Sequence, residues 1–231
     1  MIQVNKLTKT YGKDTNSFTA LKDVTFNIEA KSTVSIMGKS GSGKSTLMHI
    51  MSGLDNPTSG TVIIEGQDIF KMKAKAMDNF RSTRMSFIFQ AFFVEANQTC
   101  YQNVMLPLEI AKVSLAKRKK LVLDALAAVE LESKANDLAA NLSGGQKQRL
   151  SIARAIVNKP SILFADEPTG NLDSSTGEKI LKLLFGLNQK LGCVLVIVTH
   201  DADLAKRCQT QIILRDGKIK SINTKNKKAA D

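Results

Sequence analysis

The chain has 231 residues, which suits one large domain or one domain with a substantial insert. Its 43% hydrophobic and 23% charged residues are ordinary for a globular protein and exclude disordered and fibrous classes. The formal net charge is +12, and much of it lies in the basic runs at residues 117–120 and 225–228. Such a surface suits a nucleic acid, an anionic membrane or a solvated helix face, so charge alone selects no function.

The sequence lacks the marks of a secreted or membrane-spanning chain. Its longest apolar run, near residues 193–198, is much shorter than the roughly 18 residues that a membrane span needs. Residues 1–6 contain no apolar stretch of the kind found in a secretory signal. Cys100, Cys193 and Cys208 stand at unrelated spacings, which form neither a disulfide framework nor a zinc site. We therefore expect a soluble intracellular protein.

Short apolar runs alternate with helical stretches along the chain, as in α/β proteins. The runs that predict strands are residues 20–29, 33–37, 62–64, 86–89, 161–165 and 193–198. Helical spacing is found over residues 46–50, 122–129, 146–157 and 180–191. The last two strands are almost wholly apolar, which is typical of parallel strands covered on both faces. The early strands follow one another closely, and this suggests antiparallel pairing.

The predicted architecture is a single α/β domain over residues 1–231, with a parallel-sheet core, an N-terminal antiparallel β patch and an inserted helical lobe. The core and the β patch are expected over about residues 1–90 and 146–231. Residues 91–145 show no clear strand and at least one good helix, so we assign them to the lobe.

A glycine-rich loop follows the predicted strand 33–37 and precedes a helical run. Residues 38–46 fit the pattern G-x-x-x-x-G-K-[ST] in the strand–loop–helix context that this motif requires. Glycines let backbone N–H groups surround phosphate oxygens, and the helix N-terminus adds partial positive charge. Lys44 would reach the β- and γ-phosphates and Ser45 would ligate Mg²⁺. The predicted nucleotide-binding residues of the loop are Gly38, Lys39, Ser40, Gly41, Ser42, Gly43, Lys44, Ser45 and Thr46.

Two adjacent acids end the predicted strand 161–165. Asp166 can hold the magnesium ion, while Glu167 can polarise a water molecule for in-line attack on the γ-phosphate. The alternative is a pair of acids that cap a helix starting near Pro168. The phosphate loop elsewhere in the chain favours the magnesium interpretation.

Ser143, Gly144, Gly145 and Gln146 open the predicted helix 146–157. Ser143 and Gln146 have the spacing of a capping box, which explains these two residues without any ligand. It does not explain two glycines in the first turn, where each costs about 1 kcal/mol relative to alanine. Close approach of a second phosphate group would explain them. The simplest arrangement is a head-to-tail pair, in which this segment closes on the nucleotide held by the partner's Lys44 loop.

Taken in order, these motifs resemble those of ABC-transporter ATPase subunits over nearly the whole chain. The matching segments are residues 38–46, 142–146 and 162–167, together with His200. Residues 53–60 and 165–174 resemble the macrolide-export and lipoprotein-release branch, which also includes a cell-division pair. The resemblance implies an ATP-sandwich homodimer that hydrolyses ATP with Mg²⁺ and acts on a separate transmembrane permease. It also implies a cytoplasmic protein held peripherally on the inner face of the membrane.

The resemblance assigns roles to further residues. Tyr11 matches the aromatic residue that stacks on adenine, although by itself it could be a surface strand residue. Gln90 matches the glutamine that contacts Mg²⁺ and water and senses the membrane partner. Asp173 matches the loop acid that links the two sites of the dimer, and His200 the histidine that bonds the γ-phosphate. The expected catalytic residues are Glu167, His200, Gln90 and Lys44, and the expected metal ligands are Ser45, Gln90 and Asp166.

The departures from the family pattern lie where a membrane partner would dock, so they bear on the identity of that partner. After Gln90 the chain continues as residues 91–97, without the family's usual Asn-Leu segment and proline. Consecutive residues of an extended segment face opposite ways, so we expect Phe92 or Phe93 to point outward. The alternative is that both rings fill the core of the lobe.

Two other functions compete with that of an export ATPase. A cell-division complex that regulates a wall hydrolase would carry the same motifs, and the sequence does not separate the two. A DNA-maintenance ATPase would have hundreds of coiled-coil residues between the phosphate loop and the segment that matches residues 142–146. Here Lys44 and Ser143 are only 99 positions apart. We therefore expect no nucleic-acid partner.

Overall fold

The structure is a computed structural model that describes residues 1–12 and 14–225, so residues 226–228 of the basic C-terminal run lie outside the described part. The chain divides into two compact units. The first comprises residues 1–77 and the segment from residue 194 onward, and the second comprises residues 78–193. The limits expected for a helical lobe, residues 91–145, stay a prediction.

The first unit contains an antiparallel sheet with the strand order β2-β1-β4-β5. It confirms the predicted N-terminal β patch. Alternate residues of β1, among them Ile2 and Val4, are fully buried. The strands are β1 (Ile2–Tyr11), β2 (Phe18–Ile28), β4 (Ser59–Ile64) and β5 (Gln67–Asp68). The short helices η1 (Asp14–Asn16) and η2 (Ile69–Lys71) complete this part of the unit.

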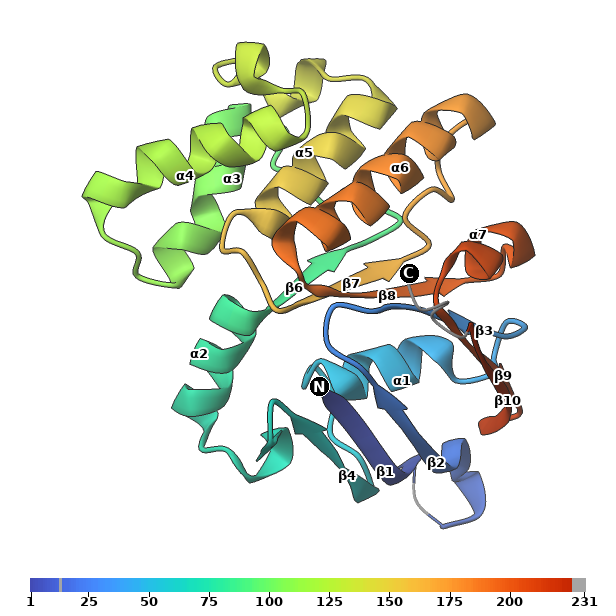
Figure 1. The fold of residues 1–231 in the computed structure, drawn as a ribbon. Coiled ribbons are helices and arrows are strands. Elements are labelled where there is room, and N and C mark those ends of the chain that lie inside the picture. Colours follow the sequence, from blue (N-terminus) through green and yellow to red (C-terminus); the bar gives the residue numbers. More distant parts are fainter. Residues whose placement is uncertain (13, 226–231) are drawn as a thin grey trace, which may run out of the picture. The chain divides into compact units, whose positions relative to one another are not determined.

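A second set of strands in the same unit has the order β10-β9-β3-β8. Its members are β3 (Thr33–Met37), β8 (Val194–Thr199), β9 (Thr210–Arg215) and β10 (Lys218–Thr224). Strand β3 is parallel to both β8 and β9, and β10 runs antiparallel to β9. All six residues of β8 are buried, as its apolar sequence predicted. Helix α1 (Lys44–Met51) follows β3, and α7 (Ala202–Arg207) follows β8 (Figure 1).

The second unit contains a parallel strand pair and the longest helices of the described chain (Figure 1). Strand β6 (Met85–Ile88) pairs with β7 (Ile162–Asp166), with Ile88 opposite Ala165. The helices are α3 (Cys100–Ile110), α4 (Leu115–Ala128), α5 (Gly144–Ile156) and α6 (Ser174–Leu191), with η3 (Glu132–Lys134) and η4 (Ala139–Asn141) between α4 and α5. Helix α2 (Ala74–Arg84) spans the boundary of the two units in sequence. Within the described part of the chain, none of the helices is long and apolar enough to cross a membrane.

Asn103, which is almost fully buried, organises the segment between β6 and α3. Its side-chain Nδ2 donates to the carbonyl oxygens of Glu95 and Thr99, each at 3.0 Å, and its Oδ1 accepts from the Glu95 N–H at 2.8 Å. Nearer to β6 in the same segment, the Arg154 guanidinium donates to the carbonyl oxygens of Phe92 and Phe93 at 3.4 and 2.6 Å. The irregular backbone after Gln90 therefore has defined partners.

Candidate functional site

The phosphate loop lies between β3 and α1 in the first unit, as predicted. Gly41 and Gly43 have φ angles of +76° and +99°, in the left-handed region that favours glycine. A Cβ on Gly38 would lie 2.5 Å from the carbonyl oxygen of Leu214, so packing alone requires glycine there. The first turn of α1 begins at Lys44, and no described side chain caps it. Its N–H groups are therefore available to an anion, as the motif requires.

The cationic side chain of the loop is held close to its backbone. Lys44 Nζ donates to the carbonyl oxygens of Gly38 and Lys39 at 2.9 and 3.0 Å. Ser42 is buried, and its hydroxyl oxygen has no hydrogen-bond partner among the described residues. A buried hydroxyl without a partner is unfavourable, so this group calls for a ligand or water in the loop. The loop thus fits a phosphate group on structural grounds.

His200 follows β8 at the same edge of the strands as the phosphate loop. Strands β3 and β8 are parallel and in register, with Met37 opposite Thr199. The residues that come next, Gly38 and His200, therefore emerge side by side. This placement agrees with the predicted contact of His200 with a γ-phosphate, which stays a prediction.

Tyr11 belongs to a hydrogen-bonded cluster in the first unit that the sequence did not reveal. Its hydroxyl donates to Asp55 Oδ2 at 2.7 Å. Lys9 Nζ forms an ion pair with Asp55 Oδ1 at 2.6 Å and lies 4.6 Å from the centroid of the Tyr11 ring. The Tyr11 side chain is held by Asp55 and Lys9, yet the residue remains 40% exposed. It can therefore present a fixed aromatic surface to a base.

The ionisation of this cluster supports the same geometry. Burial and the hydrogen bond to Asp55 raise the pKa of the Tyr11 phenol, so it stays neutral and can donate. Burial also acts to raise the pKa of Asp55, but hydrogen bonds from Lys9, Tyr11 and the Asn56 N–H outweigh it and lower that pKa. Asp55 is therefore an ionised acceptor, and a neutral phenol faces it.

The second unit places the two predicted acids at the end of β7. Asp166 is the last residue of that strand, and Glu167 follows with a φ angle of +44°, which a non-glycine residue rarely adopts. Strained backbone of this kind is found often at functional sites. Gln90 comes two residues after the end of β6, and β6 is paired in register with β7. Gln90 and the two acids therefore leave the strand pair at one edge.

Helix α5 is tied to this edge by a buried glutamine. Gln148 Nε2 donates to the carbonyl oxygen of Pro168 at 2.6 Å and lies 3.5 Å from that of Phe89. Gln148 is fully buried, and its Oε1 has no partner among the described residues. One side chain of α5 thus contacts both Pro168, which follows Glu167, and Phe89, which precedes Gln90.

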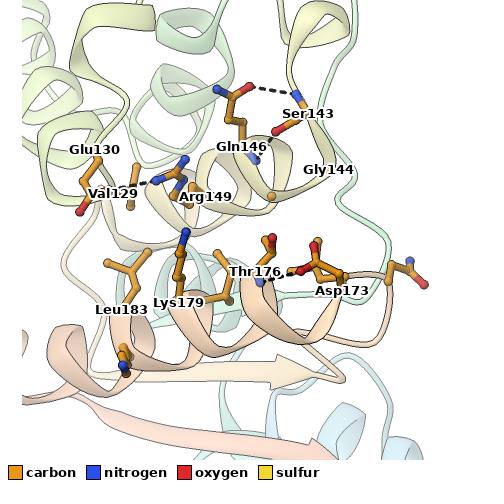
Figure 2. A pocket seen from close by; sticks show the side chains of 15 residues that line it. Val129, Glu130, Ser143, Gly144, Gln146, Arg149, Asp173, Thr176, Lys179 and Leu183 are labelled. Atoms are coloured by element: carbon orange, nitrogen blue, oxygen red, sulfur yellow. Dashed lines mark hydrogen bonds and ion pairs between the residues drawn. The ribbon is translucent and has the colours of Figure 1, made fainter.

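Residues 142–146, which we call the signature segment, contain the predicted capping box at the start of α5. The Ser143 N–H donates to Gln146 Oε1 at 2.9 Å, and the Gln146 N–H donates to Ser143 Oγ at 3.4 Å. Figure 2 shows this box beside a cavity of about 740 Å³. Its walls include Ser143, Gly144, Gly145, Gln146, Asp173 and Thr176, with Arg149, Lys179 and Lys182 as cations. The cavity therefore joins the signature segment to Asp173, two predicted elements that are far apart in sequence.

Asp173 is also the N-cap of α6. Its carboxylate accepts hydrogen bonds from the Thr176 N–H at 3.0 Å (Figure 2) and from the Ser175 hydroxyl at 2.7 Å. Bonds from Thr176 and Ser175 hold the pKa of this carboxyl well below its usual range. Asp173 is therefore ionised and fixed in place on the wall of the cavity.

The structure gives different explanations for the presence of glycine at positions 144 and 145. A Cβ on Gly145 would lie 2.6 Å from a methyl carbon of Thr176, so the approach of α6 requires glycine without any ligand. A Cβ on Gly144 would meet only Phe92 and Leu172, at 3.8 Å or more, which is ordinary contact. Close approach of a ligand is therefore an explanation that applies to Gly144 alone.

Phe92 and Phe93 point in different directions, as expected. Phe93 is 64% exposed, and its ring edge packs on Phe89 with centroids 5.3 Å apart. Phe92 is half-buried and lies next to Gly144. The prediction that at least one ring faces outward is confirmed, and the exposed ring is that of Phe93.

The expected metal ligands have the right chemistry for Mg²⁺. Ser45, Gln90 and Asp166 supply hydroxyl, amide and carboxylate oxygens, which are the donors that this ion prefers. The described residues contain no group of three or more His, Cys, Asp or Glu side chains that could hold a metal by themselves. A magnesium ion held mainly by phosphate oxygens and water needs no such group.

The structure adds three residues to the predicted set: Asp55, Gln148 and Asn171. Asp55 orients Tyr11, Gln148 joins α5 to the strand edge, and Asn171 bonds Gln90. Their residue types are common in turns and helices. Asp55 and Asn171 lie in segments 53–60 and 165–174, which carry the family resemblance, but the sequence pattern assigned no role to either of them or to Gln148.

Comparison with known proteins agrees with this geometry. A family pattern described as ABC transporter matches residues 21–170. The ATP-binding protein LolD of the lipoprotein-releasing system of Syntrophotalea carbinolica is 45% identical over 219 residues, which cover 95% of this chain and 96% of that protein.

Solved structures give the same result. The dimeric post-hydrolysis state of the ATP-binding cassette MJ0796, bound to ADP and Pi, is 41% identical with a TM-score of 0.86, over 97% of this chain and 98% of that one. The cbiO1 protein of Clostridium perfringens, part of the transporter complex cbiONQ, is 28% identical with a TM-score of 0.87, over 96% and 88% of the two chains. The chain therefore belongs to the ABC transporter family and is one of its ATP-binding subunits.

Proposed function

We propose that the chain hydrolyses ATP as one half of an ATP-sandwich homodimer and thereby powers a separate transmembrane permease. The observation that carries the proposal is the cavity of about 740 Å³ in the second unit. Its walls combine an exposed helix N-terminus with three cations, and they also contain the acids Glu130, which pairs with Arg149 at 3.0 Å, and Asp173. The helix N-terminus and the cations would receive a phosphate group that the phosphate loop of another copy supplies.

In this mechanism the residues of the chain position and activate a water molecule. Lys44 and the N–H groups of α1 hold the β- and γ-phosphates, and Tyr11 holds the base. Bound Mg²⁺ would neutralise charge on the phosphates, with Ser45, Asp166 and Gln90 as its protein ligands. Glu167 accepts the proton of the attacking water, and His200 bonds the γ-phosphate. The products are ADP and inorganic phosphate.

We further infer that the substrate is a lipoprotein or a related amphiphile at the cell membrane. The support is the 45% identity with a protein named as part of a lipoprotein-releasing system. The chain would act on the inner face of the membrane as a peripheral, cytoplasmic subunit. A wall-hydrolase regulator of the cell-division type is the second candidate, and identification of the co-purified membrane protein by mass separates the two.

The first prediction tests Tyr11 as the base platform. Asp55→Ala and Tyr11→Phe should each weaken ATP binding about fivefold, because both remove the hydrogen bond between Tyr11 and Asp55, which is worth about 1 kcal/mol. Binding of inorganic tripolyphosphate, measured by the same calorimetry, should stay unchanged, since it has no base. Asp68→Ala, which removes an acidic cap of η2 in the same unit, is the control and should affect neither ligand. Equal losses of affinity for ATP and tripolyphosphate would show that the cluster supports the phosphate loop and not the binding of the adenine base.

The second prediction concerns the general base. Glu167→Gln should keep ATP and Mg²⁺ binding but slow hydrolysis by about two to four orders of magnitude, the usual effect of removing such a group. Size-exclusion chromatography with excess ATP should then show a stable dimer. Lys44→Ala should lose nucleotide affinity and stay monomeric. A Glu167→Gln protein that remains monomeric at saturating ATP would contradict the sandwich.

The third prediction is that Ser143 acts on the nucleotide of the other copy. A mixed dimer of one Ser143→Arg chain and one Lys44→Ala chain has one site with both changes and one with neither. It should therefore hydrolyse ATP faster than either homodimer in a steady-state assay. Equal inactivity of all three would count against action in trans.

The fourth prediction concerns docking of the permease at Phe93. Phe93→Ala should leave the melting temperature and basal ATPase of the isolated subunit unchanged. In the native complex it should reduce stimulated ATPase, since exposed aromatic anchors contribute about 2 kcal/mol or more to interfaces. Phe92→Ala is the comparison, and its half-buried ring predicts a loss of stability instead. A fall of several degrees in melting temperature for Phe93→Ala would place that ring in the core.

A further inference from the structure

Gln90 is bonded to Asn171 through two reciprocal hydrogen bonds within the second unit. Gln90 Nε2 donates to Asn171 Oδ1 at 3.2 Å, and Asn171 Nδ2 donates to the backbone carbonyl oxygen of Gln90 at 3.0 Å. The two residues are 81 positions apart in sequence. One amide side chain thus holds both the backbone and the side chain of the residue expected to ligate Mg²⁺.

This bridge determines which end of the Gln90 amide faces Asn171. A backbone carbonyl can only accept, so the Asn171 NH₂ group must point toward it and the Asn171 oxygen must point toward the Gln90 side chain. That oxygen requires the NH₂ end of Gln90 as its donor. The carbonyl Oε1 of Gln90 is therefore directed away from Asn171. Only this oxygen can ligate a cation, so the bridge selects the orientation that a metal ligand needs.

Asn171 can impose this orientation because its own backbone is fixed. The Gly170 N–H donates to the carbonyl oxygen of Glu167 at 3.0 Å, and the Pro168 carbonyl accepts from the buried Gln148 at 2.6 Å. Asn171 itself lies in the next turn, which the Leu172 N–H closes by donating to the carbonyl oxygen of Thr169 at 3.1 Å and which overlaps the turn that starts at Glu167. The two hydrogen bonds to Asn171 therefore hold the Gln90 amide at a defined place relative to the backbone of Glu167.

Gly170 provides the space in which the Gln90 side chain lies. A Cβ on Gly170 would be 2.7 Å from Gln90 Nε2, 3.1 Å from its Cδ and 3.3 Å from its Cγ. A side chain there would push the Gln90 amide away from Asn171. The φ angle of Gly170 does not lie in the left-handed region, so the backbone itself tolerates alanine.

We propose that Asn171 is a positioning residue that presents Gln90 Oε1 to Mg²⁺, with Gly170 providing the room. The proposal rests on the proposed function, because it takes Gln90 as a metal ligand. It is the relation known for metal sites in general, where an outer hydrogen-bond partner orients the ligand and its loss reduces metal affinity 10- to 100-fold.

The test measures binding of a non-hydrolysable ATP analogue, AMPPNP, to the full chain by calorimetry, once in EDTA and once in excess Mg²⁺. The quantity of interest is the gain in affinity that Mg²⁺ produces. In Asn171→Ala this gain should fall about tenfold, while the affinity in EDTA stays within about twofold of the unchanged chain. Gly170→Ala should behave in the same way, because it displaces the same amide by a different route.

A double-mutant cycle separates this role from a general structural one. Gln90→Ala should lose the gain by itself, and adding Asn171→Ala should then have no further effect. The matched control is Asn158→Ala, because Asn158 also donates to two backbone carbonyls of the same unit, those of Ser82 and Pro107. It should leave the gain unchanged.

Three outcomes would overturn the proposal: an unchanged gain in Asn171→Ala, an equal loss of affinity with and without Mg²⁺, or additive effects with Gln90→Ala. Each of these outcomes is measured on the variants, with an unchanged chain that binds AMPPNP more tightly in Mg²⁺ than in EDTA. Failure of the proposed function is a different result. In that case the unchanged chain would not bind AMPPNP under either condition.

Discussion

In-register pairing of parallel strands is the constraint on which the functional site depends. Because β3 and β8 pair with Met37 opposite Thr199, the phosphate loop and His200 must start at one edge. Because β6 and β7 pair with Ile88 opposite Ala165, Gln90 and the two acids must start together as well. The ligand-binding loops of open α/β sheets are found at this carboxyl edge for the same reason. A slip of one residue in either pair would separate the groups that act together.

Hydrogen bonds from outside the motifs then fix the side chains that the strands bring together. Asp55 holds the Tyr11 hydroxyl, Gln148 contacts the backbone on both sides of the edge, and Asn171 orients Gln90. The Asp55 bond involves a charged group and the Gln148 bond a buried one, where loss of a partner is most unfavourable, whereas the Asn171–Gln90 bonds join two exposed residues. Residues proposed to contact the nucleotide, such as Tyr11 and Gln90, are thus held by neighbours outside the motifs.

The start of α5 shows how one segment serves two requirements. The capping box satisfies the helix terminus, and Gly145 lets α6 approach to where Thr176 and Asp173 complete the cavity. The N–H groups of a helix N-terminus attract anions whether or not the helix is capped by its own side chains. Stability of the helix and binding of a partner's phosphate are therefore compatible in the same four residues.

The sequence by itself determined the phosphate loop, the acids at the end of β7 and the capping box, because each is a short pattern whose residues act on one another within a few positions. It also indicated the apolar strands β7 and β8, whose burial follows from composition. Strand β1 was not predicted, since its few apolar residues are separated by one to three polar ones and only pairing with β2 and β4 makes it a strand. Only the tertiary structure decided the roles of Asp55, Gln148 and Asn171. Their hydrogen-bond partners lie 44, 20 and 81 positions away, and contacts over such separations leave no local pattern.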